Sequence, residues 1–362
     1  MNATTTMHAL HEFLALRRCW RTAFQAILAV TVLLAVSDVH GREKTDRIVF
    51  QNGDRVTGEI VELSNGRLRV KTDTMGTVSI EWIEIASIAS TYPFAFELID
   101  GTRYYGVPSV GAAPESVTVT EGETEHQLPG NRIVRLHPFE RDFISRLSGS
   151  LSFGLNATKA SNAAQFSFDA ETTYQARDSE VTLDASAISS RAEQEQASWR
   201  LDSSLQRLLY RGNRWFDIGL VSFERNDEFD LDSRINLGVG RGRFLVQTLN
   251  SEFTLFGGLQ ANIENLAGDA GSKRNLEGVI ASTYKRYIFE DPTLDLTVGL
   301  RAYPSLSDTG RLRAEFDARM RYELVNDLFI DLRVYESYDS DPPAGDGAAN
   351  DYGVVTSIGW SY

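Results

Sequence analysis

The chain has 362 residues and a formal net charge of −14 at neutral pH, which leaves room for two domains and argues against an electrostatic partnership with nucleic acid. Its hydrophobic content is 42%, and its mean hydropathy of −0.24 is typical of a water-soluble chain. A barrel whose strands alternate apolar and polar residues has a similar average, so composition does not separate the two classes. The single cysteine excludes an internal disulfide bond.

Residues 1–41 have the pattern of an export signal. Three arginines between positions 17 and 21 form a positively charged flank, and residues 23–36 form an apolar run. The run is too short for a membrane-spanning helix, which needs about 20 residues. Small side chains before position 42 predict cleavage after Gly41, so we expect the mature chain to leave the cytoplasm.

Residues 42–140 are predicted to form a small β domain with a two-fold internal repeat. The segment Gln51–Gly58 resembles Ile99–Gly106, with glycine at the third and last position of each. Glycine before an alternating strand fits a tight turn that needs positive φ. This pattern is similar to that of Sm-like and SH3-like barrels. Three roles stay open for this domain. It is expected to be a periplasmic binding module, a plug or collar under a barrel, or a small β domain without a site of its own.

From residue 145 to residue 362 the sequence predicts a transmembrane β-barrel. Apolar and polar residues alternate in segments that are separated by turn residues, as in membrane-spanning strands. Their even number fits a single-chain bacterial barrel of about 12 antiparallel strands. The predicted strands are Leu147–Ala157, Ala163–Gln175, Glu180–Ser190, Gln196–Tyr210, Arg214–Glu224, Ser233–Val246, Glu252–Glu264, Arg274–Tyr287, Thr293–Tyr303, Gly310–Leu324, Leu328–Tyr338 and Asn350–Tyr362.

The links between these strands predict an orientation in the outer membrane. One set is short, as in Arg177–Ser179, Arg211–Asn213, Glu290–Pro292 and Asn326–Asp327, whereas Arg225–Asp232 and Asp339–Gly347 are longer and acidic. Short periplasmic turns and long external loops are the rule for such barrels, so the β domain is expected in the periplasm. The acidic loops lack a complete calcium-loop pattern, and we interpret them as solvated rather than as metal sites.

One predicted strand carries a charged residue at every second position. Its apolar positions, from Leu312 to Leu324, are expected to face lipid, because Arg or Lys on a lipid face costs about 2–4 kcal/mol at the midplane. The charged positions of this strand and its neighbours are therefore expected to line the lumen. These are Arg301, Arg311, Arg313, Glu315, Asp317, Arg319, Arg321, Glu323, Asp331 and Arg333.

The last strand is predicted to close the barrel. Large residues alternate with small ones up to the terminal Tyr362, and a strand that ends with the chain needs a partner for its edge. Such an aromatic terminus resembles the signal for the outer-membrane assembly machinery. Outer-membrane lipid and lipopolysaccharide are expected around the barrel. Aromatic residues near the periplasmic ends of strands, namely Tyr174, Tyr210, Trp360 and Tyr362, are expected to form a membrane-interface girdle.

The layout resembles a bacterial family of unknown function whose members are labelled salt-induced outer-membrane proteins. The resemblance rests on the export signal, the segment Asn52–Gly58, the alternating strands and the aromatic terminus. It covers most of the mature chain and implies an outer-membrane β-barrel. It carries over no catalytic or ligand-binding residues.

No histidine follows His137, so the usual general base of barrel hydrolases is absent from the predicted barrel. No catalytic, cofactor or metal motif is present, and we expect no enzyme. Two functions stay open. One is a narrow passive channel for small solutes, in which the arginines favour anions. The other is a non-conducting barrel that anchors its periplasmic β domain, with the arginines paired to acids in a structural network. The oligomeric state is not predicted.

Overall fold

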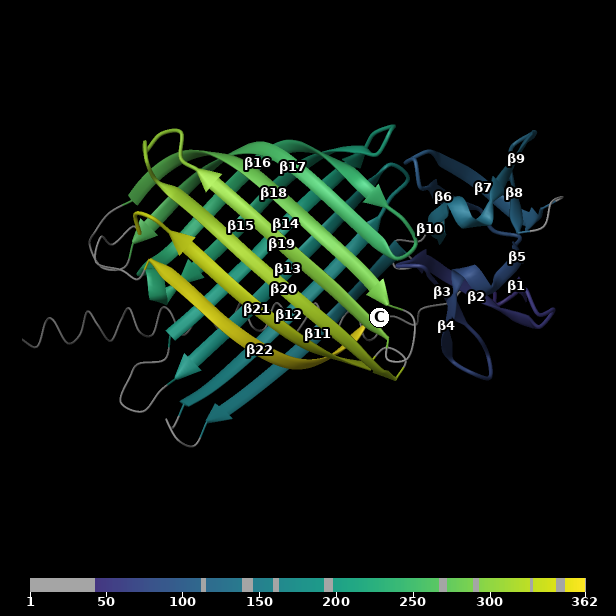
Figure 1. Ribbon diagram of the computed structural model, residues 1–362, viewed down its shortest axis with the longest axis horizontal. Coiled ribbons are helices and arrows are strands. Elements are labelled where there is room, and N and C mark those ends of the chain that lie inside the picture. The colour runs from purple at the N-terminus through teal and green to yellow at the C-terminus, as the bar shows by residue number, and fades with distance from the viewer. Residues whose placement is uncertain are drawn as a thin grey trace, which may run out of the picture. The chain divides into compact units, whose positions relative to one another are not determined.

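The computed structural model consists almost entirely of β-strands, and residues 43–362 form one compact unit (Figure 1). Among the described residues, no helix has the length and apolar character to cross a membrane. The predicted export signal, two of the predicted short turns and Tyr362 lie outside these residues. The structure describes residues 43–111, 115–138, 146–158, 163–191, 198–266, 272–288, 293–325, 328–342 and 349–361.

Ten short strands form the β module, by which we mean residues 46–138. It contains two copies of one arrangement: five strands, with a single 3-10 turn before the fifth. The turns begin at Trp82 and Gly130, where the indole Nε1 donates to the carbonyl oxygen 48 residues later. The first copy is β1 (Asp46–Phe50), β2 (Arg55–Ser64), β3 (Arg67–Lys71), β4 (Thr77–Glu81) and β5 (Ile85–Ala89); the second is β6 (Phe94–Leu98), β7 (Arg103–Val110), β8 (Ser116–Glu121), β9 (Thr124–Pro129) and β10 (Ile133–Pro138).

The repeated glycines explain why both copies fold alike. Gly53 and Gly101 have φ of 91° and 79° at the turn before the second strand, a region that favours glycine. Gly58 and Gly106 lie where that strand crosses the next one. A Cβ on Gly106 would lie 2.2 Å from the Thr120 carbonyl oxygen, so only glycine allows this approach.

The two copies share one core because each uses its last strand to cover the second strand of the other. Strand β10 pairs with β2 through Leu136 and Leu63. On the other side, the Ser90 amide directly after β5 donates to the Pro108 carbonyl in β7 at 3.0 Å. Apolar side chains of both copies meet in a single buried cluster. Neither copy buries its core without the other.

The remaining strands form the predicted closed barrel of twelve antiparallel strands, each paired with its sequence neighbours. The first and last strands close it, with Leu151 opposite Trp360 and Phe153 opposite Ile358. The fold class predicted from the sequence is therefore confirmed. The strands are β11 (Leu147–Thr158), β12 (Ala163–Gln175), β13 (Ser179–Arg191), β14 (Ser198–Tyr210), β15 (Trp215–Asn226), β16 (Leu231–Gln247), β17 (Ser251–Leu266), β18 (Ser272–Ile288), β19 (Leu294–Pro304), β20 (Leu312–Val325), β21 (Leu328–Asp339) and β22 (Asn350–Ser361).

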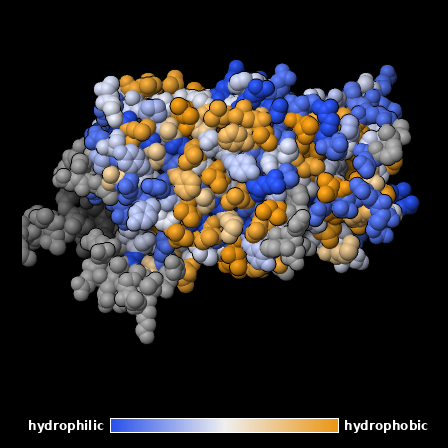
Figure 2. Space-filling view, viewed as in Figure 1, coloured by the Kyte–Doolittle hydropathy of each residue, from blue (hydrophilic) through white to orange (hydrophobic). Residues whose placement is uncertain are grey.

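The outer face of the barrel is apolar. Leu155 is 78% exposed and Val239 is 64% exposed, and hydrophobic residues cover much of the barrel surface in view (Figure 2). The alternate positions of each strand point inward, because side chains alternate between the two faces of a strand, and they include the charged residues of β19, β20 and β21. An apolar exterior around a polar interior is the arrangement of a membrane-spanning barrel.

One link departs from the prediction. The segment 225–232 was expected to be a long acidic loop, but β15 continues to Asn226 and β16 begins at Leu231. A single 3-10 turn, Asp227–Phe229, and a left-handed Asp230 join them. Phe229 and Leu231 are buried against each other, so this apolar contact shortens the link that the acidic residues suggested.

Candidate functional site

Adjacent strands place the predicted charged residues together on the inner face of the barrel. Arg301 of β19 lies opposite Glu315 of β20, and Arg321 of β20 lies opposite Asp331 of β21. Residues directly opposite in an antiparallel pair share a face. Arg311 precedes β20 and reaches the same interior. The other predicted residues, Arg313, Asp317, Arg319, Glu323 and Arg333, occupy the same face of β20 and β21.

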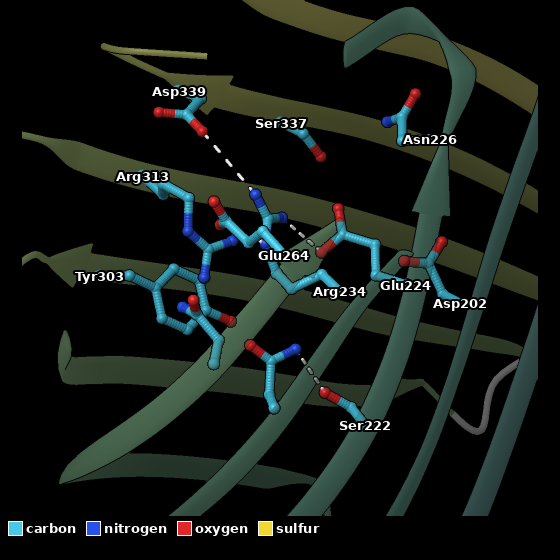
Figure 3. A network of polar contacts seen from close by, with 12 residues as sticks. Asp202, Ser222, Glu224, Asn226, Arg234, Glu264, Tyr303, Arg313, Ser337 and Asp339 are labelled. Carbon is cyan, nitrogen blue, oxygen red and sulfur yellow. Dashed lines mark hydrogen bonds and ion pairs between the residues drawn. The ribbon is translucent and has the colours of Figure 1, made fainter. Parts of the chain in front are cut away.

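A buried network lies in the lumen at the far end of the barrel, by which we mean the strand ends opposite those that contact the β module. Figure 3 shows part of this network. Arg311 donates to Glu264 at 3.0 Å and to Asp339 at 2.6 Å. Arg234 donates to the other oxygen of Glu264 at 2.7 Å and to Glu224 at 2.6 Å. The Arg234 side chain is 1% exposed and that of Glu264 is 0% exposed. We call these five residues the far-end network.

The far-end network joins strands that are not neighbours. Glu264 lies near the end of β17 and Asp339 ends β21, yet both bind Arg311. Beside them, Arg200 of β14 donates to Asp351 of β22 at 2.9 Å. Side chains from well-separated strands therefore meet across the barrel. Removing one partner of a buried ion pair is costly, so the network acts as a buried cross-link at this end.

The middle of the lumen contains a second layer of pairs. Arg313 makes a two-point contact with Glu277, with distances of 2.9 and 2.8 Å, and its guanidinium lies 4.6 Å from the centre of the Tyr303 ring. Arg301 contacts Glu315 at 3.3 Å, but its side chain is 54% exposed. Water therefore reaches Arg301, whereas Arg313 and Glu277 are buried like the far-end network.

Closer to the β module, the arginines also face carboxylates. Arg321 makes a two-point contact with Asp331 at 2.9 and 3.0 Å. Arg333 binds Asp317 and reaches Asp169 on β12 at 3.1 Å. Arg319 is the loosest, with its nearest carboxylate oxygen on Asp169 at 3.9 Å. The predicted arginine ladder is therefore largely paired.

Carboxylates outnumber basic groups on the described inner face. The sequence prediction considered three strands, but β12 to β18 supply further acids, and the far-end network depends on several of them. The basic residues are Arg200, Arg234, Lys273, Lys285, Arg301, Arg311, Arg313, Arg319, Arg321 and Arg333, and the acidic ones are Asp169, Glu171, Glu180, Asp184, Asp202, Glu224, Glu252, Glu264, Glu277, Asp295, Glu315, Asp317, Glu323, Asp331, Asp339 and Asp351. This excess of carboxylates disfavours anions.

The opposite opening is here called the module end, because residues of the β module contact it. Strand β3 of the module supplies Arg67, which contacts Glu323 at 2.9 Å and Asp295 at 3.5 Å. Its strand β10 supplies Arg135, which pairs with Glu252 of β17. We call the module in this position the collar.

A buried carboxylate stands at the centre of this contact. Glu97 of β6 is 7% exposed in its side chain, accepts from Arg103 at 2.5 Å, and accepts from the Gln247 amide of β16 at 2.7 Å. Burial alone would raise the pKa of Glu97, but the Arg135 and Arg103 guanidinium groups outweigh it and lower that pKa. Glu97 therefore stays ionised and paired at neutral pH.

Tyr210 has a different place from the one predicted. Its hydroxyl lies 2.9 Å from Glu180, and the Arg103 guanidinium lies 3.6 Å from the centre of its ring. The alternation along β14 explains this, because Leu205 is exposed on the outer face and even-numbered positions point inward. Tyr210 thus binds the collar instead of joining a lipid-facing girdle.

Two other predicted aromatics lie on the outer face. Trp360 is 65% exposed on β22, and the Tyr174 hydroxyl on β12 accepts from Arg146 at 3.2 Å. Both lie near the module end, where an interface girdle belongs. Tyr362 lies outside the described residues. Within the described parts of the chain, no group of three or more possible metal ligands occurs.

The stability of the β module is expected to fall in mild acid because of His137. Burial, with the nearby Arg103, lowers the pKa of His137 to about 4 from the usual 6.5. The folded module keeps this ring neutral, whereas the unfolded chain protonates it below 6.5. Stability is therefore complete above pH 6.5 and falls by about 3 kcal/mol as the pH drops toward 4.

The measurement is the urea midpoint for proteolysis of the module in the full chain, followed from pH 7 to pH 4.5. A His137→Phe variant should flatten this dependence, while His126→Phe, in the same module, should keep it. Above pH 4.5 the lowered pKa of Glu97 adds little to the slope. An equal slope in wild type and His137→Phe would contradict the assignment.

A family model described as "Protein of unknown function, DUF481" matches residues 151–361. The chain belongs to this family. The match covers nearly the whole barrel, from the first strand to the closing strand, and agrees with the outer-membrane barrel family of unknown function expected from the sequence. A comparison with curated proteins found no match.

Solved structures similar to this DUF481 protein are bacterial β-barrels at low identity. The NanC porin shares 12% identity over 60% of this chain and 98% of its own, with a TM-score of 0.36. The translocator domain of the autotransporter NalP from Neisseria meningitidis shares 12% identity over 60% of this chain and 86% of its own, with a TM-score of 0.35. The β domain of the Bordetella autotransporter BrkA shares 10% identity over 60% of this chain and 97% of its own, with a TM-score of 0.32.

Proposed function

We propose that this DUF481 protein is an outer-membrane barrel that does not conduct at rest and that holds its β module at the periplasmic mouth. The observation that carries this proposal is the far-end network. Arg234 and Arg311 are both buried and donate to the same carboxylate, that of Glu264. A solute would have to break charge-assisted bonds in a dry site to pass.

The positions of the turns support the orientation. The links at the module end are tight, as in the hydrogen bond from the Ala176 amide to the Ser179 carbonyl at 2.8 Å and from Thr248 to Ser251 at 2.9 Å. Short turns belong to the periplasmic side of such barrels. The collar then lies in the periplasm, and the far-end network lies toward the cell exterior.

An anion channel has less support than it had from the sequence. The arginines that suggested it have carboxylate partners, and two further acids, Glu171 and Asp184, lie opposite each other on β12 and β13. A lumen with an acid excess repels small anions. The two described histidines, His126 and His137, lie in the β module, so the proposal includes no histidine-based catalysis in the lumen.

The proposal extends to the surroundings of the barrel. The apolar outer face is suited to outer-membrane lipid, and its far end to the lipopolysaccharide leaflet. Strand β22 presents Ile358 and Trp360 outward beside its pairing partner β11. A strand of this kind at the end of the chain is suited to recognition by the outer-membrane assembly machinery.

In planar bilayers, wild-type protein is expected to show no open-channel steps. The double variant Arg311→Ser with Asp339→Ser removes one positive and one negative group from the far-end network, and we expect discrete conductance steps from it. Glu264 keeps Arg234 as a partner in this variant, so its charge stays compensated. Single-channel recording at matched protein density checks both expectations.

The matched control is Arg301→Ser with Glu315→Ser, which removes another opposite pair from a wetted part of the lumen. This variant should stay silent, because the dry layer is untouched. Resting conductance of the wild type would refute the proposal. Anion preference in that conductance would restore the channel interpretation.

A further inference from the structure

A polar cleft lies where the β module meets the barrel. Its module wall is formed by β2, β3 and β4, and its barrel wall by the module ends of β11, β12 and β19 to β22. It encloses about 250 Å³. Pockets for drug-sized ligands hold about 300–1,000 Å³, so this cleft fits a smaller molecule.

Hydroxyl groups cover both walls of the cleft. Ser64, Thr77 and Ser79 line the module side, and Ser148, Ser150 and Thr173 line the barrel side. A hydroxyl donates one hydrogen bond and accepts others. The cleft therefore offers both kinds of polar contact from opposite directions, without charge.

Charged groups of both signs line the cleft, namely the carboxylates of Glu62, Glu171, Asp295 and Glu323 and the guanidinium groups of Arg67, Arg69 and Arg321. Arg69 contacts Glu62 at 3.2 Å within the module wall. Arg67 bridges the two walls to Glu323 at 2.9 Å. A guanidinium has five N–H groups and a carboxylate has about four lone-pair sites, so each kind of group can make several hydrogen bonds.

Because both signs of charge line the cleft, neither an anion nor a cation would meet opposite charges alone. A bound anion would lie beside the carboxylates of Glu62 and Glu323, and a bound cation would lie beside Arg67 and Arg69. A neutral molecule with many hydroxyls can donate to the carboxylates and accept from the guanidinium groups at once. When such a molecule displaces water from the cleft, the charged side chains form new hydrogen bonds with its hydroxyls, and the ligand adds no net charge to the cleft.

We propose that the cleft binds a neutral saccharide of one or two rings, either free or at the end of a glycan chain. The β module supplies seven of the 18 residues that line the cleft, and the barrel supplies the others. The site does not depend on whether the lumen conducts. A failed bilayer prediction and a failed sugar prediction are therefore separate results.

The test uses the full chain in a detergent without a sugar headgroup, titrated by calorimetry and by ligand-observed NMR. Maltose and glucose are the neutral probes, and glucosamine and glucuronate are cationic and anionic analogues of the same ring. We expect saturable maltose binding with a dissociation constant on the order of 1 mM, and at least tenfold weaker binding of both charged analogues. If maltoheptaose binds as tightly as maltose, the cleft binds the end of a glycan chain. If maltoheptaose does not bind, the cleft accepts only a free sugar.

Two variants connect this binding to the cleft. Ser79→Trp fills the cleft from an exposed position on β4 and removes none of the ion pairs, so about tenfold weaker maltose binding is expected. Thr57→Trp adds the same ring at an exposed position on β2 outside the cleft and should bind maltose normally. Heat-modifiable gel mobility verifies that both fold. The proposal is overturned by no saturable binding of neutral sugars, by equal binding of a charged analogue, or by unchanged affinity in Ser79→Trp.

Discussion

Replacing Arg311 with alanine is expected to destabilise the barrel by about 3–5 kcal/mol, the usual cost of removing one partner from a buried ion pair. The change leaves Glu264 with only Arg234, and it leaves Asp339 with Arg234 at 3.9 Å as its nearest described cation. The buried carboxylates of Glu264 and Asp339 then share the Arg234 guanidinium, which also binds Glu224. Neither can recover hydration, because the site is dry.

The measurement is the temperature at which the folded barrel converts to the slowly migrating form on a gel. Arg301→Ala is the matched control, since Arg301 is also a lumen arginine but is 54% exposed. An exposed pair contributes about 0–1 kcal/mol, so this control should change the transition little. Equal shifts in the two variants would mean that the far-end network is not a structural cross-link.

Replacing Gly359 with valine is expected to prevent closure of the barrel. A Cβ on Gly359 would lie 2.5 Å from the Leu151 carbonyl oxygen of β11, and equally close to the Phe329 ring. The backbone oxygen belongs to the pair of strands that closes the barrel, so it cannot move away without breaking that pairing. An unclosed barrel exposes two strand edges, which is not tolerated in lipid.

The expected result is loss of the compact, heat-modifiable form, with aggregated or degraded protein in its place. Gly219→Val provides the control, because a Cβ at Gly219 of β15 meets no atom within 4 Å. That variant should assemble normally and migrate as wild type. Normal assembly of Gly359→Val would show that the β11–β22 seam can adapt to a side chain.

The barrel was predictable because each of its strands carries its own signal. The alternation from Leu312 to Leu324 needs no knowledge of any other strand, and the same holds for the closing strand. The module repeat was also visible, since glycine marks the same two positions of Gln51–Gly58 and Ile99–Gly106. These are local consequences of strand geometry and of positive φ.

The pairing of charges across the lumen could not be predicted in this way. Arg234 lies in a strand rich in glycine, and Glu264 stands alone among neutral residues, so neither suggests a charged face. Their meeting with Arg311 depends on barrel curvature and on contacts between strands that are not adjacent. The inward position of Tyr210 depends likewise on its register within β14. The short turn after Asn226 depends on burial of Phe229, which the surrounding acidic residues concealed.

In the β module, the last strand of each copy covers the second strand of the other copy, and this arrangement suggests how the module arose. Strand β10 of the second copy pairs with β2 of the first, and Ser90 after β5 binds Pro108 of the second copy. Equivalent patches thus meet equivalent patches, which is the geometry of a two-fold symmetric homodimer. The module has the form of two identical subunits joined into one chain by gene duplication. After the fusion, only the second copy acquired Glu97 and Arg135, while the matching positions of the first copy are Val49 and Ser87. The first copy also contacts the barrel, through Arg67, but the buried Glu97 contact belongs to the second copy alone.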